Sequence, residues 1–133
     1  MDFRTKVKLP ADGLQINHAD RLMSLGSCFS EQIGNRLTEA KFHCDVNPFG
    51  ILYNPLSIAE ALHLMLRGKP FDADSPELFA TADGWWHSFM HHSQFSAPTK
   101  DECLRLINER LQPAIEALPQ LDRLLITLGT AYV

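Results

Sequence analysis

A serine and a cysteine stand side by side where an apolar segment gives way to a helical pattern. Residues 21–26 are mostly apolar and end at a glycine, which is typical of a buried strand. Ser27 and Cys28 follow at once, and both are nucleophile types. Backbone amides at a helix N-terminus stabilise an anion such as a thiolate. The spacing therefore fits nucleophilic catalysis, and it equally fits a capping serine beside a buried structural thiol.

Three later stretches have the spacing and the caps of helices. The first follows Cys28 directly and repeats apolar residues at i, i+4 and i+7. The second starts at Asn54-Pro55, a capping asparagine followed by proline at the first helical position. The third starts with the capping box Thr99-x-x-Glu102 and is expected to kink or end at Pro113. The expected apolar faces are Ile33, Leu37 and Ala40; Ile58, Leu62, Met65 and Leu66, closed by Gly68; and Leu104, Ile107 and Leu111.

Further strands and loops are predicted outside these helices. A second buried strand is predicted over 122–128, and Gly129 and Thr130 follow it. A loose alternation predicts an edge strand over 3–9. The remaining expectations are a loop over 41–55 with an extended piece at 51–53, turns over 71–83, and a loop or one or two short strands over 85–95.

Apolar strands that end in glycine, with helices between them, indicate an α/β layered fold with a parallel sheet. Ligands of such sheets bind beyond the carboxyl ends of the strands, where Ser27, Cys28, Gly129 and Thr130 would lie. Two or three strands leave too little chain to cover both faces of a parallel sheet. We therefore expect either the N-terminal part of a longer domain or a homo-oligomer that completes the sheet.

Composition narrows the classes of function. The 133 residues carry a formal net charge of −4, which disfavours a broad electrostatic surface for nucleic acid or an anionic membrane. We find neither an apolar run long enough to span a bilayer nor the apolar core of a signal peptide. Three cysteines without metal-ligand spacing favour a reducing, cytoplasmic location. We expect no cofactor.

Several strings resemble the GSCFA family, which is placed among the SGNH/GDSL hydrolase-like folds. They are Gly26–Phe29, the Ile33-Gly34 pair, the string NPFGILYNP at 47–55, and 128–133. Ser30 stands where the name-giving motif has alanine. The resemblance implies a flavodoxin-like three-layer α/β/α sandwich, with residues 1–133 as the N-terminal portion of one domain. By analogy it also implies hydrolysis of small-molecule or carbohydrate esters, or other acyl groups.

The resemblance also suggests roles for individual residues. A gapless match places Cys28 at the nucleophile position, and a shift of one residue would place Ser27 there. Gly50 corresponds to a glycine whose amide helps to form the oxyanion hole. Gly129 and Thr130 begin the block in which the superfamily has an asparagine donor, but Ala131 stands at the donor position. Loss of one such donor lowers the rate about 10²–10³-fold.

The chain lacks the motif that supplies the catalytic base in the superfamily, and this leaves two alternatives to a hydrolase. The superfamily takes its catalytic base from an Asp-x-x-His motif, and no such motif occurs in a fitting position before Val133. A base would therefore come from outside this chain. The alternatives to a hydrolase are a non-catalytic module that binds a carbohydrate or acylated ligand, and an inactive fragment.

Histidines and aromatic residues supply the remaining candidates. His87 and His91 have i, i+4 spacing, which fits a metal ligand pair or a local general base for Ser27 or Cys28. The segment is not convincingly helical and has no acidic residue at ligand spacing, so no metal is expected. Asn47 is either a polar group of the site or the cap of a turn. An aromatic cluster predicts a sugar or acyl platform, or else packing: Trp85, Trp86, Phe89 and Phe95.

Overall fold

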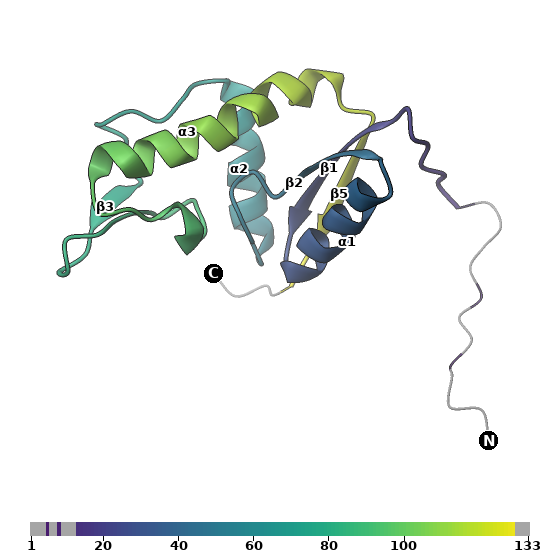
Figure 1. The fold of residues 1–133 in the computed structure, drawn as a ribbon, viewed down its shortest axis with the longest axis horizontal. Helices are drawn as coiled ribbons and strands as arrows, with labels where there is room; N and C mark the ends of the chain where they lie inside the picture. The colour runs from purple at the N-terminus through teal and green to yellow at the C-terminus, as the bar shows by residue number, and fades with distance from the viewer. Residues whose placement is uncertain (1–4, 6–7, 9–12, 130–133) are drawn as a thin grey trace.

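The computed structural model describes residues 5, 8 and 13–129 of the chain, and Figure 1 shows how its elements are arranged. In chain order they are β1 (Arg21–Gly26), α1 (Cys28–Glu39), β2 (His43–Val46), α2 (Pro55–Arg67), β3 (Leu78–Ala80), β4 (Trp86–Ser88), η1 (Ser93–Phe95), α3 (Lys100–Ala117), η2 (Leu118–Gln120) and β5 (Arg123–Thr127). The edge strand predicted over 3–9 falls mostly outside the described residues.

A parallel three-stranded sheet in the order β2-β1-β5 confirms the α/β prediction. The central strand β1 is buried from its second residue onward, as its apolar sequence predicts. Helix α1 lies on one face of the sheet, and α2 and α3 pack on the other (Figure 1). The core on that second face includes residues of β1 but none of β5, whose Leu124 and Ile126 are 39% and 45% exposed. These three layers are consistent with part of a flavodoxin-like fold.

Small residues bring α1 close to the sheet. The fully buried residues of α1 are Ser30 and Gly34, whereas the predicted apolar residues Ile33 and Leu37 are only partly buried. A Cβ at Gly34 would lie 2.6 Å from the hydroxyl oxygen of Ser24 in β1. The predicted helix is therefore confirmed, but its packing face is centred on small residues that a search for apolar periodicity overlooks.

The opposite face of the sheet holds the main core. Met23 and Leu25 of β1 pack there with residues of α2 and α3. Their core partners on the two helices are Ile58, Ala61, Leu64, Met65, Cys103, Ile107, Leu111 and Ala114. Leu66, predicted on the buried face of α2, is 70% exposed, because the helical period brings Ala61 and Leu64 inward instead.

The helix caps follow the sequence closely. The Asn54 side chain accepts from the backbone N–H of Ser57, and Gly68 closes α2 in the left-handed conformation. The Thr99 hydroxyl accepts from the backbone N–H of Glu102. Of the two outcomes predicted for Pro113, a kink or a helix end, the end does not occur, because α3 runs through Pro113 to Ala117. Pro113 lies on an exposed side of the helix, where water can satisfy the carbonyl that loses its partner.

Two segments predicted as loop or turn contain strands. Within 41–55, residues His43–Val46 form β2, and no strand forms at 51–53. Within 71–83, residues Leu78–Ala80 form β3, which pairs antiparallel with β4. Both strands lie at sheet edges and are at most half-buried, so neither has the apolar run that marks a core strand. In the part of the chain that is described, no helix is both long and apolar enough to span a membrane.

Candidate functional site

Gly26 makes the sharp corner between β1 and α1. Its φ angle is 141°, a region that side-chain-bearing residues rarely adopt. A Cβ at Gly26 would overlap the backbone carbonyl oxygen of Thr127 at the end of β5. The corner therefore requires glycine, both for its backbone conformation and for the close approach of the neighbouring strand.

Ser27 caps α1 and is held by β5. Its hydroxyl oxygen accepts from the backbone N–H of Phe29 at 3.3 Å and lies 3.2 Å from the hydroxyl oxygen of Thr127. The Ser27 backbone N–H donates to the carbonyl and hydroxyl oxygens of Thr127, at 3.3 and 3.2 Å. The residue is only 8% exposed. Its hydroxyl is thus occupied by a structural role.

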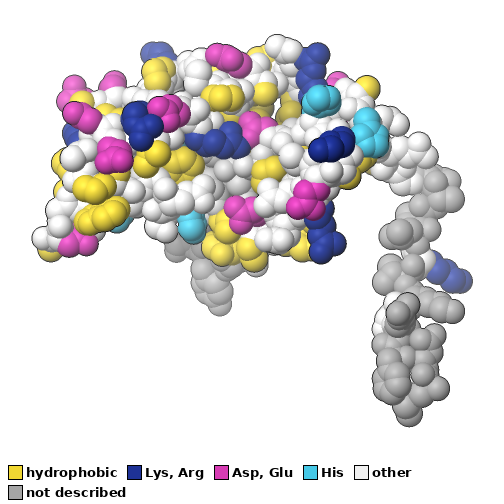
Figure 2. Space-filling view, viewed as in Figure 1, with side chains coloured by type: hydrophobic (Ala, Val, Ile, Leu, Met, Phe, Trp, Pro, Cys, Tyr) yellow, Lys and Arg dark blue, Asp and Glu magenta, His cyan; other side chains and the backbone are white. Residues whose placement is uncertain are grey.

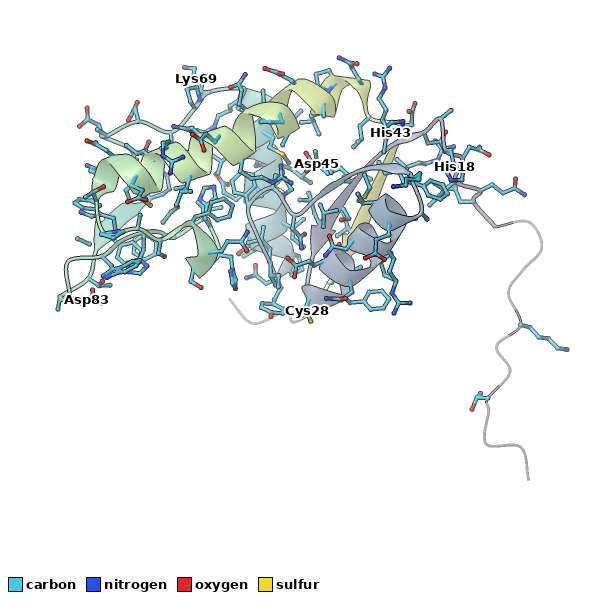
Figure 3. All side chains as sticks on the ribbon, in the orientation of Figure 1. His18, Cys28, His43, Asp45, Lys69 and Asp83 are labelled. Atoms are coloured by element: carbon cyan, nitrogen blue, oxygen red, sulfur yellow. The ribbon has the colours of Figure 1, made fainter. Side chains whose placement is uncertain are left out.

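Cys28 is the first residue of α1, and its side chain is exposed (Figure 3). The backbone N–H of a residue at this position has no partner inside its helix. The N-terminus of a helix also carries partial positive charge, which stabilises an anion placed there. The sheet-to-helix corner therefore presents the thiol, rather than the neighbouring hydroxyl, to solvent.

Asn47 ties a turn after β2 to the same corner. Its backbone N–H donates to the carbonyl oxygen of Ser24 at 2.9 Å, and its Oδ1 accepts from the backbone N–H of Gly26 at 3.0 Å. The residue is 3% exposed and has a left-handed φ of 44°. Its Nδ2 is buried and has no hydrogen-bond partner among the described residues. The Asn47 side chain thus bonds the Gly26–Cys28 corner, and its backbone carbonyl closes the turn by accepting from the backbone N–H of Gly50.

Gly50 closes that turn and does not present a free donor. Its backbone N–H donates to the carbonyl oxygen of Asn47 at 2.8 Å. A Cβ at Gly50 would overlap the Cβ of His92, so glycine allows the two loops to pack closely. The resemblance implies a Gly50 amide directed at a substrate oxygen, and in this conformation the amide is engaged within the turn.

The block after β5 is described only as far as Gly129. The backbone N–H of Gly129 donates to the carbonyl oxygen of Tyr53 at 2.8 Å, just before α2. The candidate residue Thr130 lies outside the described residues, as does Ala131. Thr127 is the residue that sequence reasoning missed. Its position as the last residue of a parallel strand is the signal that would have found it. The prediction that this strand is buried is wrong, because β5 lies at an edge of the described sheet and its side chains Leu124 and Ile126 are 39% and 45% exposed.

His87 and His91 belong to a different part of the molecule. The Nδ1 of His87 lies 2.7 Å from the Ser96 hydroxyl, and its Nε2 lies 3.1 Å from the Thr81 hydroxyl. His91 lies 2.9 Å from the Ser88 hydroxyl and stacks on Phe49 with ring centroids 4.6 Å apart. Burial lowers the pKa of His91 to about 3.

These two histidines are anchored by their own surroundings. Among the described residues, none of the histidine hydrogen bonds reaches Ser27 or Cys28. No group of three or more metal-ligating side chains gathers in the described part of the chain. In this conformation, no hydrogen bond among the described residues supports His87 or His91 as a general base for Ser27 or Cys28.

The other two cysteines occupy enclosed positions. Cys103 is fully buried in the core, and Cys44 in β2 is partly buried. Burial raises the pKa of both thiols, so both remain protonated at neutral pH. Cys44 also lines a hollow of about 710 Å³ at the amino-terminal end of the sheet, opposite the Gly26–Cys28 corner. Of the three thiols, Cys28 is the exposed one.

The chain was compared with curated proteins, with solved structures and with protein-family models. No curated protein and no solved structure matches the chain significantly. The family model described as "GSCFA family" matches residues 21–133, a range that runs from the start of β1 through the corner and the Asn47 turn. By this match, the chain belongs to the GSCFA family.

Proposed function

We propose that this domain transfers an acyl group from an ester to the thiol of Cys28 and then hydrolyses the resulting thioester. One observation carries the proposal. At the β1–α1 corner, the Ser27 hydroxyl is nearly buried and caps the helix, whereas the Cys28 thiol is exposed on the first helical residue. This contrast favours Cys28 over Ser27 as the nucleophile.

The proposed reaction has two steps. The Cys28 thiolate attacks the ester carbonyl, the carbon–oxygen bond to the alcohol breaks, and the alcohol leaves with a proton from water. Water then attacks the thioester, releasing the carboxylic acid and restoring the thiol. The substrate class is a small-molecule or carbohydrate ester.

Negative charge on the carbonyl oxygen develops beside the N-terminus of α1. Backbone N–H groups of the first helical turn stabilise such charge, and each well-placed donor contributes a large part of a rate enhancement. The Asn47 side chain fixes the corner through the backbone N–H of Gly26. Esters with good leaving groups need no general acid, so activated esters are the substrates we expect to react fastest.

A second candidate is a non-catalytic module that binds an ester or a related ligand. The observation in its favour is that no histidine in the described residues forms a hydrogen bond with Ser27 or Cys28. A general base typically contributes 10²–10⁴-fold to the rate, so a corner without one would be a weak catalyst.

Hydrolysis of para-nitrophenyl acetate distinguishes the two candidates. We expect Cys28→Ala to lower the rate at least about tenfold, to the level of the uncatalysed reaction, because it removes the nucleophile. Ser27→Ala removes a helix cap, worth about 1 kcal/mol of stability, and keeps most of the activity. Cys44→Ala is the control with the same number of remaining thiols as Cys28→Ala. Equal rates for Cys28→Ala and Cys44→Ala would contradict the proposal.

A further inference from the structure

The β3–β4 hairpin has one face turned to the core and one turned to solvent. Side chains alternate between the faces of a strand. Leu78 and Trp86 pack against the core, and Ser88 is buried with them. Phe79 pairs with His87 across the hairpin, so both lie on the opposite, outer face. Phe89, two residues after His87, continues this face beyond the end of β4.

Aromatic rings are stacked along this outer face. The rings of Phe79 and Phe89 are nearly parallel, with an interplanar angle of 20° and centroids 4.2 Å apart. His87 stacks on Phe79 at 5.3 Å and 25°. Phe89 is nevertheless 73% exposed, and Trp85, two residues before His87, is 43% exposed. We call these four residues, Phe79, Trp85, His87 and Phe89, the aromatic face.

Hydrogen bonds hold the aromatic face in place. Both ring nitrogens of His87 lie within hydrogen-bond distance of a hydroxyl, from Ser96 and from Thr81. The backbone N–H of Trp85 donates to Asp83 at 3.2 Å, and the backbone N–H of Phe89 donates to the carbonyl oxygen of Glu77 at 2.9 Å. These bonds fix the His87 ring and the backbone at Trp85 and Phe89, and the Phe89 ring is oriented by its stacking on Phe79, which limits the conformational entropy that a ligand would have to remove.

Acidic and hydroxyl groups border the rings. Asp83 stands at the tip of the hairpin, well apart from Cys28 (Figure 3). The Thr81 hydroxyl donates to its carboxylate, and this bond lowers the pKa of Asp83. Figure 2 shows hydrophobic side chains gathered at the lower left, over the hairpin, with acidic side chains beside them. The border therefore offers hydrogen-bond acceptors and repels a polyanion.

We propose that the aromatic face binds a neutral carbohydrate. The C–H groups of a pyranose ring carry partial positive charge and fit against the negative face of an aromatic ring. Phe89, backed on one side by Phe79, offers such a ring face, and the Asp83 carboxylate can accept from sugar hydroxyls. Exposed apolar patches bordered by polar groups commonly mark binding sites.

The spacing of the exposed rings favours an oligosaccharide over a single sugar. Trp85 and Phe89 flank the short strand β4, one before it and one after it, and four residues of extended chain span about 13 Å. Two rings at that distance contact different sugars of one chain. The negative net charge and the carboxylate of Asp83 disfavour nucleic acid as the ligand. This proposed site does not include Cys28, so the two proposals can be tested separately.

The test is titration with cellohexaose, xylohexaose and chitohexaose, three neutral oligosaccharides that differ in their ring substituents. Binding is measured by calorimetry and by tryptophan fluorescence, to which the exposed Trp85 and the inward-packed Trp86 both contribute. We expect binding to at least one of them, weakened at least about tenfold in Phe89→Ala, because truncation of an aromatic contact at a binding site typically costs more than 1 kcal/mol. Leu66→Ala on α2 is the matched control, since Leu66 is 70% exposed and lies outside the aromatic face.

Each result decides the matter. Binding that is lost in Phe89→Ala and kept in Leu66→Ala and Cys28→Ala supports the proposal. Absence of binding to all three oligosaccharides at millimolar concentration overturns it, as does equal binding by Phe89→Ala in a variant that unfolds at the wild-type temperature. Binding of heparin or of an arginine-rich peptide in place of the neutral sugars would also overturn it. Loss of esterase activity in Cys28→Ala leaves this test unchanged.

Discussion

The β1–α1 corner and the β3–β4 hairpin each contain a glycine in a left-handed conformation, but the two regions expose different groups to solvent. Each contains a glycine with positive φ, 141° at Gly26 and 84° at Gly84. At the corner, neighbouring backbone encloses the glycine, whereas a Cβ at Gly84 would meet nothing within 4 Å. The corner fixes the backbone and exposes a single thiol, and the hairpin leaves whole rings open to solvent. The first arrangement suits chemistry at one atom, and the second suits contact over a surface.

Alanine at the two glycines should give the largest difference between these regions. In Gly26→Ala the new Cβ overlaps the Thr127 carbonyl and the backbone is also strained, so we expect a loss of roughly 3 to 5 kcal/mol in the free energy of unfolding. In Gly84→Ala only the backbone strain remains, and the expected loss is about 1 kcal/mol.

Urea unfolding of both variants measures these losses. If Gly26→Ala is insoluble, its failure to accumulate beside a soluble Gly84→Ala supports the same conclusion. Equal stability of the two variants would show that the corner is not enclosed as described.

The buried His91 should make the stability of the protein depend on pH. Burial lowers the pKa of His91 to about 3, from an ordinary value near 6.5. The unfolded chain therefore binds a proton more readily than the folded protein between these pH values. Stability should fall as the pH is lowered through this range, by up to about 1.4 kcal/mol per pH unit from this one group.

His91→Phe keeps an aromatic ring beside Phe49 and removes the proton-binding site. We expect it to flatten the dependence of unfolding free energy on pH between neutrality and about pH 4. His63→Phe, on the exposed surface of α2, serves as the control and should leave the slope unchanged. An unaltered slope in His91→Phe would mean that His91 is not buried as a neutral ring.

The residues that the sequence predicts best are those whose role is local. The caps Asn54 and Thr99 and the strand-ending Gly26 act within a few residues of their own positions. For the same reason, the corner that presents Cys28 could be placed on a helix N-terminus from sequence alone. The resemblance to the GSCFA family added the membership that the match over residues 21–133 confirms.

What the sequence did not predict depends on contacts between distant segments. β2 is a strand because its backbone pairs with β1, and its own residues have little apolar character. Thr127 holds Ser27 from a position 100 residues away in the chain. The predicted platform included Trp86 and Phe95, but both pack inward, and the exposed Phe89 instead stacks on the partly buried Phe79. Which face of a short hairpin meets solvent is set by what packs behind it.

The most direct test of the proposed function is to identify the atom that receives the acyl group. The protein is mixed with para-nitrophenyl acetate, quenched in acid within seconds, digested, and sequenced by mass spectrometry. We expect one acetyl group on the peptide that contains Cys28, lost again on longer incubation and absent from Cys44 and Cys103, which are less exposed. Acetylation of Ser27, or equal acetylation of Cys28 and Cys44, would contradict the assignment of Cys28 as the nucleophile.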